Sequence, residues 1–354
     1  MPQRILVINP GSTSTKIAVY EDGVELFSEG MAHSAEEIGR YSCIADQIGF
    51  REAAIREVLT RRGFDLGSLA CVVGRGGLLK PIPGGVYAVS DMMKYELQTA
   101  RYGEHASNLG APIADGLARE LGIPAFIADP VVVDELSDLA RIYGHRQFRK
   151  QSIFHALNQK AVARRWAAEH GKRYEDVRLV VAHMGGGVSV GYHHLGRVVD
   201  VNNALNGEGP FSPERAGTLP AGALAKLCFS GTVTEKEVMK MINGQGGTVS
   251  LAGTNDMRVL EAGYMKGEPE ATLIYNAFIY NVGKAIGALA AVAEGKLDGI
   301  VLTGGIAYGK PVQEGLARMC GWMAPVTVYA GEGELEALAA AGSRGLAGEA
   351  MEYT

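Results

Sequence analysis

One short sequence pattern occurs twice in the chain, over residues 5–19 and again over residues 179–192. Each copy has an apolar run, a polar residue, a tight turn rich in Gly and small side chains, and a second apolar run, which is typical of a β-hairpin. Aligning the glycines of the two turns places Asn9 over His183. Either copy alone fits an ordinary hairpin, but the pair predicts two related sheets whose first turns face each other across a cleft.

The turns themselves indicate what such a cleft would bind. Backbone N–H groups in turns of Gly, Ser and Thr form concave sites for anions. We therefore expect a phosphate chain to be held between the two turns. The chain has no Gly-x-x-x-x-Gly-Lys-Ser/Thr loop, and no Gly-x-Gly-x-x-Gly follows the first strand, which disfavours the P-loop and Rossmann folds.

Length and charge narrow the class of protein. A chain of 354 residues accommodates two domains of roughly 100–200 residues each. Its 48 glycines are about twice the usual share and imply many backbone turns. The formal charge is only −5, with Lys and Arg scattered along the chain, so nothing indicates a nucleic-acid surface or a polybasic membrane segment. A small-molecule partner is favoured.

Cysteine spacing and hydropathy predict the compartment. The four cysteines lie far apart, without the paired spacing of a zinc or redox site, and we expect reduced, mostly buried thiols. The N-terminal residues lack the features of a signal peptide. The longest apolar stretch, residues 285–293, is well short of the ~20 residues that span a bilayer. These features predict a soluble, cytoplasmic protein with no membrane partner.

Two polar residues follow predicted strands in the first half of the chain. Residues 69–73 form a buried strand pattern that runs into Gly-Arg-Gly-Gly, so Arg75 lies at the carboxyl end of a strand. Asp129 follows the short strand pattern of residues 125–128 in the same way. Open α/β sheets bind their ligands at these strand ends.

The second half predicts further elements in a similar alternation. After a domain crossover at 150/151 we expect a helix over 151–170, the second hairpin, a loop over 207–218, helices over 234–242 and 273–293, and a strand over 299–303. Thr234 and Glu237 have the spacing of a capping box at the start of their helix. A final helix over 332–351 is expected to return to the first domain.

Several motifs, in order and spacing, resemble the acetate and butyrate kinases over essentially the whole chain. They are NPGSTSTK (9–16), GRGG (74–77), EHASN (104–108), ADP (128–130), FHALNQ (154–159), AHMGGG (182–187), ERAGT (214–218), NDMR (255–258) and LTGGI (302–306). The resemblance implies two duplicated RNase H-like (actin-like ATPase) domains with an interdomain cleft. Residues 1–150 with 332–354 would then form an acyl-substrate lobe, and residues 151–331 a nucleotide-binding lobe.

The resemblance also implies a reaction. The γ-phosphoryl group of ATP would move reversibly onto a short-chain carboxylate, giving an acyl phosphate and ADP, and the GRGGLLKPIPGG segment looks most like the branch that phosphorylates butyrate or a branched acid. Such an acid has a pKa near ~4–5 and is ionised at pH 7, so no base is needed and the site should be rich in cations and positioned donors. Acetate kinase is the near alternative. A sugar or polyol kinase on this scaffold would use Asp129 as a base, and an Hsp70-like ATP switch would need a peptide-binding module for which no residues remain.

The implied catalytic residues fit that demand for positive charge. Arg75 would pair with the substrate carboxylate through its planar fork. Arg215 and His155 would stabilise the transferring phosphoryl group, and His105 and His183 would line the cleft, His105 on the substrate side. The ordinary alternatives are a strand-end salt bridge for Arg75 and structural roles for the histidines.

The resemblance further implies Mg²⁺ and a set of nucleotide contacts. Asn9, Asp129 and a glutamate at the start of the last helix would approach the metal, and Glu334 is preferred over Glu336. The residues assigned to the nucleotide are Ser12, Ser14, Lys16, His183, Gly185, Gly186, Gly187, Asp256, Met257, Arg258, Gly304, Gly305 and Ile306. We also expect a homodimer or a larger homo-oligomer.

Two departures from the acetate kinase pattern weaken a strict assignment to that enzyme. Gly186 stands where acetate kinase has an Asn, so one side-chain donor is missing from the turn. Ala307 and Tyr308 replace a Gly-Glu pair after the adenosine turn.

Overall fold

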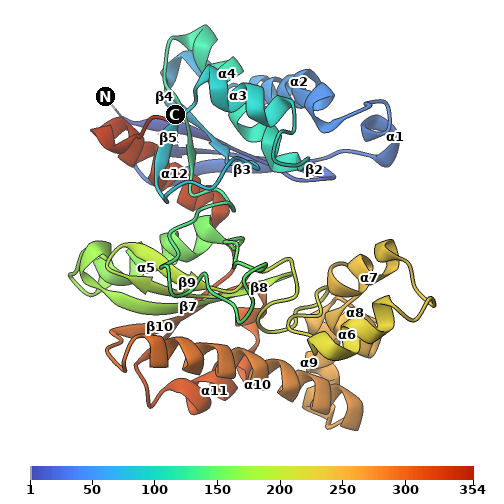
Figure 1. Ribbon diagram of the computed structural model, residues 1–354. Helices are drawn as coiled ribbons and strands as arrows, with labels where there is room; N and C mark the ends of the chain where they lie inside the picture. The colour runs from blue at the N-terminus through green and yellow to red at the C-terminus, as the bar shows by residue number, and fades with distance from the viewer. Residues whose placement is uncertain (1) are drawn as a thin grey trace. The chain divides into compact units, whose positions relative to one another are not determined.

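The computed structural model of this protein describes residues 2–354. The chain forms two compact units: unit 1 is the chain up to Val133 together with Gly333–Thr354, and unit 2 is Asp134–Glu332. The crossover expected at 150/151 falls inside unit 2. Each unit contains one β-sheet with helices packed against it (Figure 1).

Unit 1 is built on a six-stranded sheet with the order β3-β2-β1-β4-β6-β5. Its strands are β1 (Arg4–Pro10), β2 (Ser14–Glu21), β3 (Val24–Ala32), β4 (Leu69–Arg75), β5 (Val86–Ala88) and β6 (Ala125–Ala128). Strands β1, β2 and β3 are antiparallel neighbours, whereas β1, β4 and β6 run parallel. The carboxyl ends of the three parallel strands therefore lie along one edge of the sheet.

Helices cover both faces of this sheet, and successive side chains along β1 point to opposite faces. Leu6 and Ile8 share a core with residues of α2 and α4. Ile5 points to the other face, where a Cβ at Gly342 of α12 would come within 2.9 Å of it, so glycine is needed for this close packing. The helices of unit 1 are α1 (Ala35–Ile38), α2 (Ile48–Arg61), α3 (Asp91–Gln98), α4 (Gly110–Leu121) and α12 (Glu334–Arg344).

Unit 2 repeats the arrangement with a five-stranded sheet of order β11-β10-β7-β8-β9. Its strands are β7 (Arg178–Met184), β8 (Val188–His194), β9 (Arg197–Val201), β10 (Gly299–Gly304) and β11 (Val326–Ala330). The antiparallel hairpin β7–β8 corresponds to β1–β2, and β10 and β11 run parallel to β7 as β4 and β6 do to β1. The prediction of two duplicated sheets from the repeated hairpin is confirmed.

Helices also cover both faces of the unit 2 sheet. Val180 packs in a core with Phe278 of α10, whereas the next residue, Val181, packs with Ala163 of α5. The helices are α5 (Ala156–Glu169), α6 (Ala221–Cys228), α7 (Glu235–Ile242), α8 (Gly247–Ala252), α9 (Met257–Lys266), α10 (Pro269–Val292) and α11 (Lys310–Cys320). Short helical turns complete both units: η1 (Ile44–Gln47), η2 (Leu66–Ser68), η3 (Ala106–Leu109), η4 (Tyr174–Asp176), η5 (Gly305–Tyr308) and the π-helical η6 (Gly345–Glu349).

Local predictions are confirmed where caps and periodicity are strong, but several boundaries differ: the helix expected from residue 273 begins at Pro269, and the one expected over 332–351 is α12, Glu334–Arg344. The capping box of Thr234 and Glu237 is present at the start of α7. Helix α5 begins at Ala156 instead of residue 151, because the carbonyl of Ile153 accepts a hydrogen bond from the backbone of Ala204 and that of Gln151 accepts one from the side chain of Asn203.

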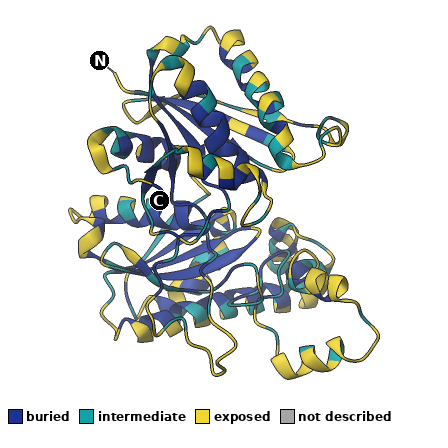
Figure 2. Cartoon of the chain, turned by 45° about the horizontal axis from the view of Figure 1, so that its top comes forward, coloured by how far each residue is buried: buried dark blue, intermediate teal, exposed yellow. Residues whose placement is uncertain are grey.

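The burial pattern separates core strands from exposed helix faces in both units (Figure 2). All four thiols are unpaired. Cys71 and Cys320 are buried, but Cys43 and Cys228 are exposed, so the expectation of mostly buried cysteines holds for only two of the four. Within residues 2–354, no helix is long and apolar enough to cross a membrane.

Candidate functional site

In unit 1, three predicted site residues lie at the carboxyl ends of adjacent parallel strands. The register pairs Ile8 of β1 with Gly74 of β4, which places Asn9 beside Arg75. Arg75 in turn pairs with Ala128 of β6, directly before Asp129. The structure therefore brings Asn9, Arg75 and Asp129 together at one sheet edge, as expected for ligand-binding residues of an open α/β sheet.

A carboxylate occupies the guanidinium fork of Arg75. The guanidinium lies 3.0 Å from Oε1 and 3.2 Å from Oε2 of Glu334, the first residue of α12. Asn9 donates from Nδ2 to the same Oε2 at 2.6 Å, and its Oδ1 accepts from Arg75 at 3.1 Å. Glu336 is exposed, so of the two candidate glutamates it is Glu334 that adjoins Asn9.

Asp129 is held in an uncommon backbone conformation. Its φ angle is +39°, in the left-handed region that non-glycine residues rarely adopt, and the residue is only 1% exposed. Two hydrogen bonds with Gly85 fix it: Oδ1 accepts from the Gly85 N–H at 2.7 Å, and the Asp129 N–H donates to the Gly85 carbonyl at 3.0 Å. Such local strain is common at ligand sites.

His105 lies at the start of η3, where it caps this helical turn. Its Nδ1 accepts from the backbone N–H of Ser107 at 3.2 Å, which leaves the other ring nitrogen, Nε2, to carry the proton. Partial desolvation of the ring and, second, the positive charge of Arg75 lower the pKa of His105. A neutral imidazole thus lies within the electrostatic reach of Arg75.

A buried arginine that the sequence did not reveal supports the turn between β1 and β2. Arg51 of α2 is 1% exposed, and its guanidinium donates to the carbonyls of Gly11, Ser14 and Ser12 at 2.8, 2.9 and 3.2 Å. Within the turn, the Gly11 N–H donates to the Ser14 carbonyl at 2.8 Å. The side chains of Ser12 and Lys16, both predicted to contact nucleotide, are exposed.

In unit 2, two predicted site residues converge on the last glycine of the turn between β7 and β8. A Cβ built at Gly187 would overlap the guanidinium of Arg215 and would lie 3.3 Å from Cε1 of His155. The turn closes through a hydrogen bond from the Gly185 N–H to the Gly187 carbonyl at 3.0 Å, and Ser212 donates to the Gly186 carbonyl at 2.8 Å.

The rings of His155 and His183 are stacked beside this turn. Their centroids are 3.8 Å apart and their planes are inclined by 11°. His183 is 3% exposed, and its Nδ1 lies 2.7 Å from Oδ1 of Asn158, while its Nε2 would be 3.2 Å from a Cβ at Gly185.

Neutral oxygen atoms hold the Arg215 guanidinium in place. It donates to the Ala204 carbonyl at 2.9 Å and to Oδ1 of Asn243 at 3.3 Å. Burial lowers the pKa of Arg215, and the charge of Glu214 opposes this shift only in part. The group remains a cation next to the glycine turn, where an anion would complete its interactions.

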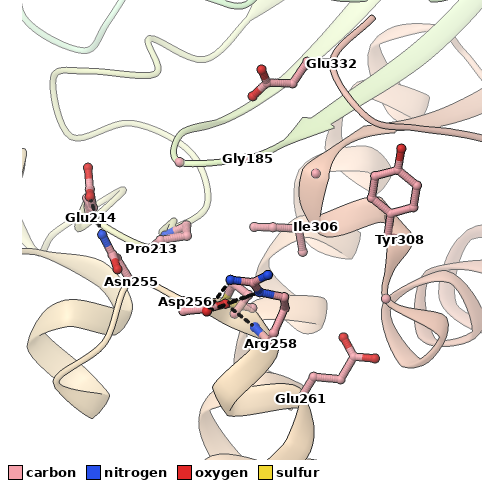
Figure 3. Close-up of a pocket in the computed structure, with 14 residues that line it drawn as sticks. Gly185, Pro213, Glu214, Asn255, Asp256, Arg258, Glu261, Ile306, Tyr308 and Glu332 are labelled. Atoms are coloured by element: carbon pink, nitrogen blue, oxygen red, sulfur yellow. Dashed lines mark hydrogen bonds and ion pairs between the residues drawn. The ribbon is translucent and has the colours of Figure 1, made fainter. Parts of the chain in front are cut away.

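A pocket of about 620 Å³ adjoins the same turn (Figure 3). It is lined by Gly185, Gly186, Pro213, Glu214, Asn255, Asp256, Met257, Arg258, Glu261, Gly305, Ile306, Tyr308, Gly309 and Glu332. Asp256 caps α9, and hydrogen bonds from the side chain and backbone of Arg258 lower the pKa of Asp256 to about 2. The predicted Gly304 lies just behind the lining residues, with a φ angle of +88° and no room for a Cβ against the backbone of Met184.

Several lining residues were missed by the sequence interpretation. Glu214, Asn255 and Glu261 had no assigned role, although Glu214 and Asn255 stand inside the quoted motifs. Asn255 donates to Glu214 at 2.8 Å, and Glu261 accepts from the hydroxyl of Tyr275 at 3.1 Å. Glu261 lies on α9 and Asn255 lies just before it, and the sequence did not predict this helix.

Oxygen-bearing side chains in unit 1 fit a metal that binds few protein groups. Within residues 2–354, no cluster of three or more His, Cys, Asp or Glu side chains forms a metal cage. Asn9 and Glu334 nevertheless place amide and carboxylate oxygens side by side. This donor set suits Mg²⁺, which prefers oxygen and retains several waters.

Comparisons with known proteins agree with the two-unit fold. A model of the acetokinase family matches residues 138–321. The chain is 54% identical over 349 residues to a probable butyrate kinase of Clostridium botulinum (strain Alaska E43 / Type E3), covering 99% of this chain and 98% of that protein. It is 53% identical over 352 residues to butyrate kinase 1 of Clostridium acetobutylicum, covering 99% of both chains.

Crystal structures of related kinases have the same fold at low sequence identity. The acetate kinase of Porphyromonas gingivalis superposes with a TM-score of 0.78 at 18% identity, covering 96% of this chain and 99% of that one. A propionate kinase from Francisella tularensis subsp. tularensis SCHU S4 gives a TM-score of 0.73 at 18% identity, covering 95% and 98%.

Proposed function

Because the chain belongs to the acetokinase family, we propose that it transfers the γ-phosphoryl group of ATP to butyrate or a branched short-chain acid, reversibly forming an acyl phosphate. The observation that carries this proposal is the bidentate grip of Arg75 on the carboxylate of Glu334. A guanidinium at the end of β4 that already binds one carboxylate is suited to bind another. The full-length identity to relatives named butyrate kinases favours a four-carbon acid over acetate.

The chemistry requires charge neutralisation more than proton transfer. A short-chain carboxylate is ionised at pH 7, since its pKa is near ~4–5. It attacks phosphorus without a base, and the rate depends on bringing two anions together and on stabilising the phosphoryl group in flight. Asp129, fixed by Gly85 and near Arg75, would then help to position metal and phosphate instead of removing a proton.

Unit 1 would supply the acyl site and the metal ligands. Arg75 would hold the acid, with the neutral ring of His105 nearby. Asn9, Asp129 and Glu334 would hold Mg²⁺, which supplies positive charge to the phosphate oxygens when it is bound. Ser12, Ser14 and Lys16 would add donors from the turn between β1 and β2.

Unit 2 would hold the nucleotide. The turn of Gly185–Gly187 offers backbone N–H groups to the phosphates, and Arg215 and His155 beside Gly187 would stabilise the transferring group. The adjoining pocket would take the adenosine between Asp256–Arg258 and Gly305–Ile306. We also propose, from the sequence alone, that the enzyme is cytoplasmic and that it forms a homo-oligomer.

One assay tests the proposal and separates its alternatives. Purified protein, ATP, Mg²⁺ and butyrate are incubated with hydroxylamine, which traps an acyl phosphate as its hydroxamate. We expect butyryl hydroxamate to accumulate, with rates on isobutyrate and butyrate above those on acetate. Acetate as the best substrate would identify an acetate kinase instead. Absence of hydroxamate from every two- to five-carbon acid, with phosphorylation of a sugar or polyol, would overturn the proposal.

A further inference from the structure

A chain of buried hydrogen bonds runs behind His155. His155 Nδ1 lies 2.8 Å from the hydroxyl oxygen of Ser189, and Gln159 Nε2 lies 2.8 Å from the same oxygen. Gln159 Oε1 continues to Nε2 of His193 at 3.0 Å, and His193 Nδ1 to the hydroxyl of Tyr174 at 2.8 Å. Ser189, Gln159 and His193 are all 0% exposed, so bulk water does not contribute to this chain.

A backbone carbonyl fixes the direction of the chain. Gln159 Nε2 also donates to the Ser189 carbonyl at 3.0 Å, and because a carbonyl only accepts, the amide nitrogen must face Ser189. The amide oxygen then faces His193, whose Nε2 must carry the proton. Burial, and then the charges of Lys160 and Arg164, lower the pKa of His193 well below its usual value, so this ring is neutral and its Nδ1 accepts from Tyr174.

The hydroxyl proton of Ser189 consequently has one destination. Its oxygen is approached by Gln159 Nε2 and, at 3.4 Å, by the backbone N–H of His155, and both of these groups are donors. The remaining neighbour is Nδ1 of the His155 ring. Ser189 therefore donates to Nδ1, and the proton of His155 lies on Nε2. In an imidazole, the hydrogen bond at one nitrogen sets the state of the other in this way.

The stacked partner of His155 has a different proton arrangement. Asn158 donates from Nδ2 to the Glu332 carbonyl at 2.5 Å, which turns its Oδ1 towards His183. That oxygen can only accept, so His183 carries a proton on Nδ1. The two stacked rings therefore differ at Nδ1, which accepts a hydrogen bond in His155 and donates one in His183. The supporting Asn158 and Gln159 are adjacent residues of α5.

We propose that Ser189 and Gln159 are positioning residues that lock His155 in the neutral tautomer with its proton on Nε2, so that the ring presents a hydrogen-bond donor to the transferring phosphoryl group. The donor role rests on the function proposed above, whereas the tautomer does not. A ring with the proton on Nδ1 would instead present a lone pair, which repels phosphate oxygens. Loss of the correct tautomer is costly in other enzymes that use an imidazole.

Nuclear magnetic resonance tests the tautomer directly on the full-length protein. With ¹⁵N-labelled histidine, long-range ¹H–¹⁵N correlation at neutral pH distinguishes a protonated from an unprotonated ring nitrogen, and His155→Gln assigns the signals. We expect an unprotonated Nδ1 and a protonated Nε2 in the wild type. A protonated Nδ1 in His155 of the wild type would overturn the proposal without reference to any variant.

Substitutions along this series of hydrogen bonds test the direction of each bond. Gln159→Glu replaces the donor by an acceptor, so the Ser189 hydroxyl should turn to it and His155 should become protonated on Nδ1. Ser189→Ala should remove the preference for Nε2, and Ser189→Thr should restore it. Tyr174→Phe, a matched control, deletes one hydrogen bond at the far end and should retain the wild-type signature. An unchanged His155 signature in both Ser189→Ala and Gln159→Glu would contradict the assignment.

Kinetics then link the tautomer to catalysis. Ser189→Ala should lower kcat about tenfold or more with a smaller change in KM for ATP, since the donor acts mainly in the transition state. A wild-type protein inactive on every short-chain acid would refute the proposed function while the spectra still decide the tautomer. A tautomer shifted in Ser189→Ala with unchanged kcat would refute the donor role alone.

Discussion

The two hairpin turns occupy equivalent places in equivalent sheets, yet they are built from different materials. Asn9 and His183 each stand one pair before the end of the hairpin ladder, in β1–β2 and β7–β8 respectively. The first turn carries Ser and Thr side chains, and the guanidinium of Arg51 donates to its backbone carbonyls. The second consists of three glycines, and its neighbouring guanidinium, Arg215, donates to Ala204 and Asn243, which lie outside the turn.

This difference shows how two copies of one scaffold can use a neighbouring arginine in different ways. Arg51 uses its donors on the carbonyls of the first turn and is buried, so its charge is committed to structure. Arg215 is held by two neutral oxygens, and its charge stays available to an anion. The two arginines thus differ in whether their hydrogen bonds end on the carbonyls of the turn or on oxygens outside it. Four experiments compare the two hairpins and the residues that support them.

The largest effect is expected from Arg215→Ala. In the proposed reaction Arg215 stabilises developing charge, so its removal should lower kcat by about 10²–10³, with a smaller change in KM. Arg215→Lys should recover only part of the rate, because an ammonium lacks the planar fork. Arg258→Ala, on the pocket wall, is the matched control and should raise KM for ATP more than it lowers kcat. Steady-state kinetics decide the matter, and an unchanged kcat in Arg215→Ala would remove this residue from the mechanism.

The counterpart in the first turn should affect stability. Arg51→Met deletes several buried hydrogen bonds from a charged donor and should lower the free energy of unfolding by about 3 kcal/mol or more. Ser212→Ala removes one neutral hydrogen bond to the second turn and should cost about 1 kcal/mol. Urea denaturation followed by circular dichroism measures both. Equal losses would mean that the two turns depend on their supports to the same degree.

Alanine at a turn glycine gives a contrast of intermediate size. In Gly187→Ala the new methyl group would collide with the Arg215 guanidinium and displace it, so kcat/KM should fall about tenfold or more. In Gly11→Ala the nearest atom, Oγ of Ser14, is 3.4 Å from the new Cβ, and the methyl group fits. A greater loss of activity in Gly11→Ala than in Gly187→Ala would reverse the comparison.

Acid should weaken both hairpins through a buried histidine. His33 bonds to Thr15 at 2.8 Å in unit 1, and His193 lies on β8, the second strand of the other hairpin; burial is the main cause that lowers the pKa of each ring. Below about pH 6.5 the unfolded chain binds more protons than the folded one, so the free energy of unfolding falls as pH decreases, by about 1.4 kcal/mol per pH unit for each ring held neutral. The loss should continue to lower pH for His193, whose pKa is depressed more strongly. His33→Gln should reduce the slope between pH 6.5 and 5, and an unchanged slope would exclude His33.

Local patterns revealed the scaffold but not the contacts that tune it. The hairpins, the strand ends at Arg75 and Asp129 and the cap of α7 all depend on neighbours in sequence, so their residues could be read directly. Arg51 was not among the predicted site residues, because its burial depends on carbonyls about 40 residues away in the sequence. The hydrogen bond between Gln159 and Ser189 likewise joins α5 to β8, and a hydrophobic repeat along the sequence cannot predict a contact between separate elements.

The ion pair between Arg75 and Glu334 has a consequence for the order of events in the proposed reaction. In this structure the guanidinium of Arg75, which would bind the substrate acid, is already paired with the carboxylate of Glu334 at 3.0 Å. A cation that recruits Glu334 would vacate the fork, so metal and acid should each strengthen the binding of the other. The acid would in this way bind tightly to Arg75 only after the metal is bound.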